Sequence, residues 1–136
     1  RWTLIAARSP EDCTPTKNLW VLGHYSRFVC PGMRRVSVLS SRSQSPVDSA
    51  DDLMASAFVD ETGARWVAVV INYRDKKRTV RLVTADAAES DMEGRLVPFL
   101  TDADRSMERG TPVAVGEPVT LPPRSIFTFV SRPAAE

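Results

Sequence analysis

The sequence predicts a mainly β fold: an antiparallel β-sandwich of about seven to eight strands, preceded by one strand-like segment and one α-helix. From residue 34 onwards, short segments that alternate apolar and polar residues recur at intervals of about 8–12 residues, separated by turn-forming residues. Before that point, a short apolar run and a segment with helical periodicity form a different pattern, which is typical of one unit of an α/β layer.

The amino-terminal part is expected to hold one strand and one helix. Residues 2–7 form an apolar run of strand length, and residues 16–29 have helical periodicity, with Thr14 or Thr16 as N-cap and Pro31 after the end. One helix face is apolar, and on it lie Leu19, Val21, Leu22, Tyr25, Phe28 and Val29. Because this face is wide, it must pack on a large neighbour. His24 lies outside it and is predicted either at the surface or as a residue that supports a site without touching a ligand.

The remaining segments predict the strands of the sandwich. Residues 65–73 are apolar on both faces, which indicates a central strand covered on both sides. With residues 53–60 and 79–84 it is predicted to form a three-stranded meander. Pro98 places the strand at 95–101 at an edge or a bulge. The other expected strands cover residues 34–40, 112–115, 119–121 and 125–131, and residues 40–52, 85–94 and 102–110 are expected to be loops.

Composition excludes several classes of protein. The chain has 136 residues, 43% hydrophobic and 26% charged, an ordinary balance for one globular domain. No apolar run has the length of a membrane span. The net charge is +1, and the one basic cluster, at residues 76–78, follows an aspartate, so no nucleic-acid partner is expected. The chain opens with Arg1, no signal peptide is recognisable, and we expect a piece of a longer protein.

The residues that could carry chemistry are few. With a single histidine, a metal site or a Ser-His-Asp triad has little material. Cys13 and Cys30 are expected to be free thiols, because the intervening helix would hold them too far apart for a disulfide. The acidic residues fall in turns and loops, where we expect exposed, solubilising charge: Asp51, Asp52, Asp60, Glu61, Glu89, Asp91, Glu93, Asp102 and Asp104. Glu108 with Asp102 and Asp104 gives only an incomplete calcium-loop pattern. No cofactor, metal or catalytic residue is predicted.

Aromatic residues are the candidates for contact with carbohydrate. Trp66 and Tyr73 flank the predicted central strand, and Phe58 lies on the strand before it. Exposed, these rings could stack on sugars; buried, they would be part of the core, which is the more usual role of such residues. Trp2 is the remaining candidate, and composition alone says nothing of its role.

Residues 19–36, LWVLGHYSRFVCPGMRRV, resemble a segment of glycoside hydrolase family 30, which includes glucosylceramidases, xylanases and endo-β-1,6-galactanases. Cys30 departs from the arginine usual there. Further along, LMASAFVDETGARWVAVVINY, VPFLTDADRSM and VTLPPRSIFTFV resemble the family's hairpin, a following segment and its closing strand. The matching residues of the first segment are Leu22, Gly23, Tyr25, Ser26, Arg27, Phe28, Pro31, Gly32, Arg35 and Val36.

The resemblance implies a (β/α)8 barrel with a β-sandwich at its side. Residues 1–32 would then be the remnant of the last β/α unit, and residues 33–136 the sandwich domain. The family's two catalytic glutamates lie on earlier barrel strands, one of them in an Asn-Glu-Pro triplet that this sequence lacks. Trp2 would match an aromatic residue near the sugar site. The parent protein would be secreted or periplasmic.

Three hypotheses for function follow. In the first, the chain is the non-catalytic C-terminal portion of a retaining, polysaccharide-degrading family 30-like enzyme of bacteria, of the endo-β-1,6-galactanase type, and its partner is the missing barrel. In the second, it is a carbohydrate-binding module that uses Phe58, Trp66 and Tyr73. In the third, it is an immunoglobulin-like interaction domain that self-associates through the helix face of Leu19, Leu22, Tyr25, Phe28 and Val29. The chain alone is predicted to be inactive.

Overall fold

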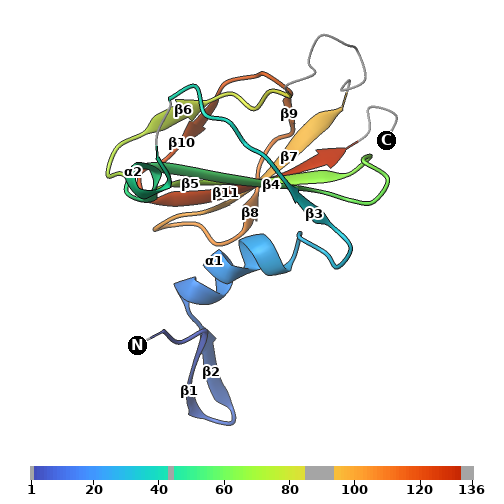
Figure 1. The fold of residues 1–136 in the computed structure, drawn as a ribbon. Coiled ribbons are helices and arrows are strands. Elements are labelled where there is room, and N and C mark those ends of the chain that lie inside the picture. Colours follow the sequence, from blue (N-terminus) through green and yellow to red (C-terminus); the bar gives the residue numbers. More distant parts are fainter. Residues whose placement is uncertain (1, 43–44, 85–93, 133–136) are drawn as a thin grey trace.

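The computed structural model describes residues 2–42, 45–84 and 94–132, and it confirms a mainly β, antiparallel fold (Figure 1). The predicted acidic loop with Glu89, Asp91 and Glu93 lies outside the described residues. The elements are β1 (Ile5–Ser9), β2 (Asp12–Pro15), α1 (Lys17–Ser26), β3 (Arg34–Val36), α2 (Pro46–Ala50), β4 (Leu53–Val59), β5 (Trp66–Asn72), β6 (Arg78–Val80), β7 (Arg95–Thr101), β8 (Glu108–Arg109), β9 (Val113–Ala114), β10 (Val119–Leu121) and β11 (Ser125–Arg132).

A seven-stranded sheet forms the body of the molecule. Its strand order is β3-β4-β5-β11-β7-β8, with β9 also paired to β7, and a second sheet consists of β6 and β10. The predicted meander is therefore wrong in its third member, since β6 pairs with β10 and β11 takes the place beside β5. Strand β5 needs a long partner on each side to satisfy its backbone, and the eight residues of β11 provide one where the three of β6 could not.

Apolar residues cover the main sheet on both faces, as the sequence of β5 predicts. Ala68 and Val70 face a first core between the main sheet and the β6–β10 layer, whereas Val67 and Val69 face a second core under α1. Figure 1 shows β6 and β10 on one side of the sheet and α1 on the other. Alternation along a strand sends neighbouring side chains to opposite faces, so one apolar strand serves both cores. The other buried residues of the first core are Leu96, Leu100, Leu121, Phe127 and Phe129.

Pro98 lies where the edge of the sheet is interrupted. Its carbonyl accepts a hydrogen bond from the N–H of Gly110 at 2.8 Å, so its own nitrogen also points to this side of β7. There β8 pairs with residues 99–100 and β9 with residues 95–96, which leaves Pro98 between two short partners. The missing N–H therefore costs no regular ladder bond, although β7 is not an edge strand, since β11 pairs along one side of it and β8 and β9 along the other.

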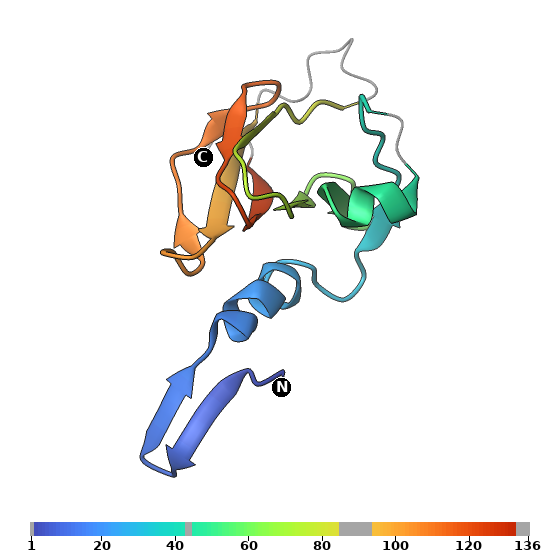
Figure 2. The ribbon, with the colours of Figure 1, turned by 90° about the vertical axis from the view of Figure 1, so that its left-hand side faces the viewer.

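The first strand differs from the prediction. In place of a single buried strand at residues 2–7, β1 and β2 form an antiparallel hairpin, and every residue of both strands is exposed. The hydroxyl of Ser9 accepts hydrogen bonds from the N–H groups of Glu11 and Asp12, which closes the turn. Figures 1 and 2 show the hairpin projecting away from the sandwich, at the far end of α1.

A short helix, α2, lies within the segment expected to be a loop. Ser45 is its N-cap: its hydroxyl accepts a hydrogen bond from the N–H of Asp48 at 3.2 Å and donates one to the Asp48 carboxylate at 2.6 Å. Ser-Pro followed by an acidic residue is a helix-start signal, so the sequence carried this information. The serine-rich composition around it obscured the signal.

The surroundings of two glycines predict different effects on stability when each is replaced by alanine. A Cβ on Gly23, within α1, would lie 2.9 Å from the terminal methyl group of Met107, which can move aside, and helix propensity would gain about 1 kcal/mol. A Cβ on Gly94 would overlap the backbone carbonyl oxygen of Arg132, which cannot. We expect Gly23→Ala to be nearly neutral and Gly94→Ala to lower the free energy of unfolding by about 1–3 kcal/mol in urea titrations. Equal effects would contradict this account of the two contacts.

Candidate functional site

The contact between α1 and the main sheet is built around His24, which is fully buried. Its Nδ1 lies 2.8 Å from the Thr128 hydroxyl on β11, and its Nε2 lies 2.8 Å from the Thr101 hydroxyl on β7. The Thr128 hydroxyl in turn donates to the His24 carbonyl at 3.0 Å, and the Met107 N–H donates to the Thr101 hydroxyl at 2.9 Å. The imidazole therefore joins the helix to two neighbouring strands.

The network fixes the tautomer of the neutral His24 ring. Because the Thr128 hydroxyl uses its proton on the His24 carbonyl, it must accept from Nδ1–H, and Nε2 then accepts from Thr101. The neutral ring satisfies every partner without a charge. Burial lowers the pKa of His24 from 6.5 to about 4.

The predicted surface position of His24 is therefore wrong. The periodicity predicted that the apolar arc around Leu22 is the buried face. In the structure the side of the helix that carries His24 faces the sheet, and Leu22 is 49% exposed. Sheet threonines, which read as ordinary strand residues, are what make this position suitable for a histidine. Gly23 lies at the contact with Met107, where the absence of a side chain allows the close approach.

Part of the predicted apolar helix face is used within the chain. Phe28 is buried, and its ring centroid lies 4.6 Å from that of Phe99. Tyr25 donates or accepts a hydrogen bond with Ser56 at 3.1 Å, and its ring meets Phe58 edge-on at 6.4 Å. Val29 packs against the second core. Phe28 is therefore not available to a partner, which corrects the face proposed for self-association.

Other apolar side chains of this region are at least 40% exposed. We call them the amino-terminal apolar surface: Trp2, Leu4, Ile5, Val21 and Leu22, with exposed fractions of 92%, 42%, 51%, 40% and 49%. The Thr16 N–H donates to the Leu4 carbonyl at 2.9 Å, and the Asn18 amide reaches the Thr3 carbonyl at 3.4 Å, so the hairpin and the start of α1 are joined. Leu19, at the start of the helix, is half-buried.

The aromatic candidates for carbohydrate contact do not share one face. Trp66 is half-buried and packs against the first core, whereas Phe58 contacts Tyr25 on the opposite side of the sheet. Tyr73 lies one residue beyond the other end of β5 and is 45% exposed. Trp2 is part of the amino-terminal apolar surface. A single platform of these rings is therefore not formed, and sugar contact through Trp2, Trp66 or Tyr73 individually stays a prediction.

Two carboxylates expected at the surface are buried, each beside arginine. Asp102 accepts two hydrogen bonds from the Arg105 guanidinium, at 2.7 and 3.2 Å. Burial alone would raise the pKa of Asp102, but these bonds and those from the N–H groups of Asp104 and Arg105 hold it below its usual value. Asp102, a member of the incomplete calcium-loop pattern, is therefore paired with an arginine. Among the described residues no group of three His, Cys, Asp or Glu side chains could hold a metal ion.

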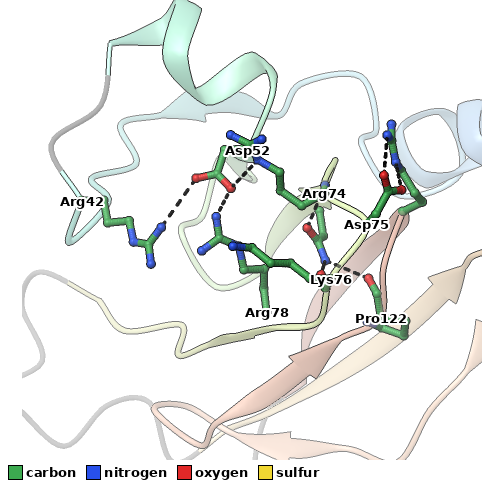
Figure 3. A network of polar contacts seen from close by, with 9 residues as sticks. Arg42, Asp52, Arg74, Asp75, Lys76, Arg78 and Pro122 are labelled. Carbon is green, nitrogen blue, oxygen red and sulfur yellow. Dashed lines mark hydrogen bonds and ion pairs between the residues drawn. The ribbon is translucent and has the colours of Figure 1, made fainter.

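Asp52 is the centre of the second network, at the end of the sheet (Figure 3). Its carboxylate contacts the guanidinium groups of Arg42 at 3.7 Å and Arg74 at 3.4 Å, and that of Arg78 directly. Arg78 is the most deeply placed of the three, with 15% of its side chain exposed. Nearby, the buried Asn72 amide donates to the Lys76 and Pro122 carbonyls at 2.8 and 2.9 Å. The network ties α2, β5, β6 and the turn before β11 together.

Both cysteines are free, as predicted, and both are exposed. No helix in the described part of the chain is long and apolar enough to cross a membrane.

No family model matches the sequence. Among solved structures, the fold is similar to a conserved exported protein from Bacteroides fragilis, with a TM-score of 0.76 and 29% identity over 88% of this chain and 22% of that one. It is also similar to a family 30 endoxylanase from Clostridium papyrosolvens C71, with a TM-score of 0.69 and 27% identity over 88% of this chain and 28% of that one. The resemblance to glycoside hydrolase family 30 is confirmed.

A family 30 subfamily 8 xylanase from Clostridium acetobutylicum shares the fold, with a TM-score of 0.66 and 21% identity over 87% of this chain and 28% of that one. The chain thus spans about a quarter of the length of each of these structures. It is a glycoside hydrolase-related domain, similar to the C-terminal domain of family 30 enzymes. The division into a barrel remnant at residues 1–32 and a sandwich at residues 33–136 stays a prediction.

Proposed function

We propose that this chain is a non-catalytic β-sandwich domain of a retaining glycoside hydrolase. Its amino-terminal apolar surface docks on the catalytic part of that enzyme. The observation that carries the proposal is the division of α1 into two sides. His24 of α1 and Phe28, two residues beyond its end, attach the helix to the sandwich, while Val21, Leu22 and the adjoining hairpin present apolar side chains to a neighbour.

Isolated hairpins of two strands are marginally stable in water, so an exposed β1–β2 hairpin favours a covering neighbour. Exposed apolar clusters likewise mark interaction sites. The remainder of an enzyme like the similar xylanases, about three-quarters of the chain, is the natural candidate, since the matched domain is only 28% of those structures. The buried His24 bonds would then hold the docking helix in one orientation on the sandwich.

The carboxylates of the described residues favour a non-catalytic role. A retaining glycosidase needs two carboxyl groups about 5–5.5 Å apart, one of them with a raised pKa so that it can act as an acid. Here the buried carboxylates, Asp52 and Asp102, are instead held by arginines. For Asp102 the pKa is lowered, which is opposite to the requirement for an acid.

For the parent enzyme we propose a polysaccharide substrate and export from the cell. Similarity to two xylanases supports the first, and similarity to an exported protein supports the second. The endo-β-1,6-galactanase type is a proposal that rests on the sequence resemblance alone. Purified 136-residue chain should show no turnover of aryl β-glycosides, and clear hydrolysis would overturn the non-catalytic role.

The docking surface predicts a contrast between two kinds of apolar residue. In the isolated chain, Ile5→Ser combined with Leu22→Ser should leave the melting temperature nearly unchanged and reduce binding of a hydrophobic dye, because both side chains are half-exposed. Phe28→Ala, in the second core, should instead cost about 3 kcal/mol.

The double variant could instead lose as much stability as Phe28→Ala. That result would show that the two side chains stabilise the fold itself and do not form a docking surface. Light scattering on the same samples tests the alternative of self-association. If the chain forms a stable dimer and the double substitution dissociates it, the surface binds a second copy of this chain and not the catalytic part.

A further inference from the structure

A second surface lies at the end of the sheet opposite Trp66, where β5 leaves the core. Residues 67–70 and Asn72 of the strand are buried, and the next residue, Tyr73, is 45% exposed. The N–H of Tyr73 donates to the Asp52 carbonyl at 2.8 Å, which fixes the backbone of the aromatic residue. An aromatic side chain placed in solvent directly after a central strand is a feature that packing does not require.

Arg124 holds the Tyr73 ring in place. Its guanidinium carbon lies 4.5 Å from the ring centroid, and the same group donates to both oxygens of Asp75, at 2.7 and 3.3 Å. The backbone of Arg124 is anchored as well, since its N–H donates to the Arg74 carbonyl at 2.9 Å and its φ is +48°. Ring, guanidinium and carboxylate thus form a preorganised polar and aromatic surface.

Positive charge exceeds negative charge around this ring. Arg74, Asp75 and Lys76 line a shallow depression beside it. Behind it, three guanidinium groups share the one carboxylate of Asp52, and the buried Nε of Arg78 has no hydrogen-bond partner among the described residues (Figure 3). Arg42 and Arg74 keep 63% and 52% of their side chains exposed, so donors remain free for an anion.

We propose that Tyr73, Arg74, Lys76 and Arg124 form a binding site for a polysaccharide that carries carboxylate groups. The apolar C–H face of a sugar would lie on the exposed part of the Tyr73 ring, and its carboxylate would pair with the guanidinium of Arg74 and the ammonium of Lys76. The carboxylates of Asp52 and Asp75 pair with Arg74 and Arg124 in this region, which disfavours a nucleic acid, whose phosphates call for a continuous basic surface. The site does not depend on the proposed docking function.

The test is affinity electrophoresis of the 136-residue chain in gels that contain polygalacturonate, fully methyl-esterified polygalacturonate or DNA. We expect retardation by polygalacturonate, and its loss with the ester, which keeps the sugar backbone but removes the charge. Tyr73→Ala and Arg74→Gln should each weaken binding by about five-fold or more, whereas Tyr73→Phe should retain it. Arg109→Gln removes an exposed arginine from β8 and is the matched control for net charge.

Three results would overturn the site: no retardation by polygalacturonate, equal retardation by DNA, or equal weakening by Arg109→Gln and Arg74→Gln. Circular dichroism of each variant separates loss of binding from loss of fold. If Tyr73→Ala does not fold, the comparison of Arg74→Gln with Arg109→Gln decides the question alone. If the polysaccharide site is overturned, the results of the docking experiments on Ile5 and Leu22 are unaffected.

Discussion

The free energy of unfolding is expected to fall by about 2 kcal/mol when the pH is lowered from 7 to 5, because of His24. Burial lowers the pKa of this residue from 6.5 to about 4, so the unfolded chain binds a proton that the folded chain does not. Stability is therefore fully present above pH 6.5 and is lost progressively as the pH approaches 4. Urea titrations at several pH values measure the slope.

The sequence makes this experiment clean, since His24 is the only histidine. Asp102, whose pKa is lowered, contributes stability that is lost only as the pH falls below the usual aspartate value of 3.8, outside the window measured. His24→Gln keeps a donor and an acceptor without a titrating group, and it should lose the slope between pH 7 and 5. A slope that persists in this variant would contradict the assignment, and an NMR titration of His24 in the wild-type chain provides a direct check.

The second large effect is expected at Asp52. Asp52→Asn keeps the shape of the side chain but leaves the poorly exposed guanidinium of Arg78 without its counter-charge, which should cost about 3 kcal/mol of unfolding free energy. Arg42 and Arg74 are more than half exposed, so their ion pairs with Asp52 contribute little to the free energy of unfolding. Chemical denaturation of the variant measures the loss.

Asp75→Asn is the matched control, because its partner Arg124 and Asp75 itself are both largely exposed. It should change stability far less than Asp52→Asn. Adding Arg78→Met to Asp52→Asn should restore much of the stability, since an apolar side chain replaces the uncompensated charge. If the double variant is no more stable than Asp52→Asn alone, the cost does not come from Arg78.

Much of the sheet could be predicted because its strands carry a local signal. Strand β7 occupies residues 95–101, as predicted, and its Pro98 falls at the interrupted edge. The two apolar faces of β5 correctly indicated a strand between two cores. Period-two alternation and turn residues depend only on neighbours along the chain, so they can be recognised without the fold.

The partners of the strands could not be predicted in the same way. Strand β6 was expected beside β5, and the structure pairs it with β10, about 40 residues later. The exposed hairpin of β1 and β2 was likewise not expected, because residues 12–15 show no apolar alternation. Pairing depends on which distant segment satisfies a backbone, and a local pattern does not contain that information.

The sequence by itself determined the antiparallel β architecture, the central strand and the resemblance to family 30, since periodicity and ordered motifs are properties of the chain alone. Only the tertiary structure decided the environments of His24, Asp52 and Tyr73. A histidine, a carboxylate or an aromatic ring becomes buried, paired or exposed according to the groups that the fold brings around it. For His24 and Asp52 those groups include Thr101, Thr128 and Arg78, which lie far along the sequence.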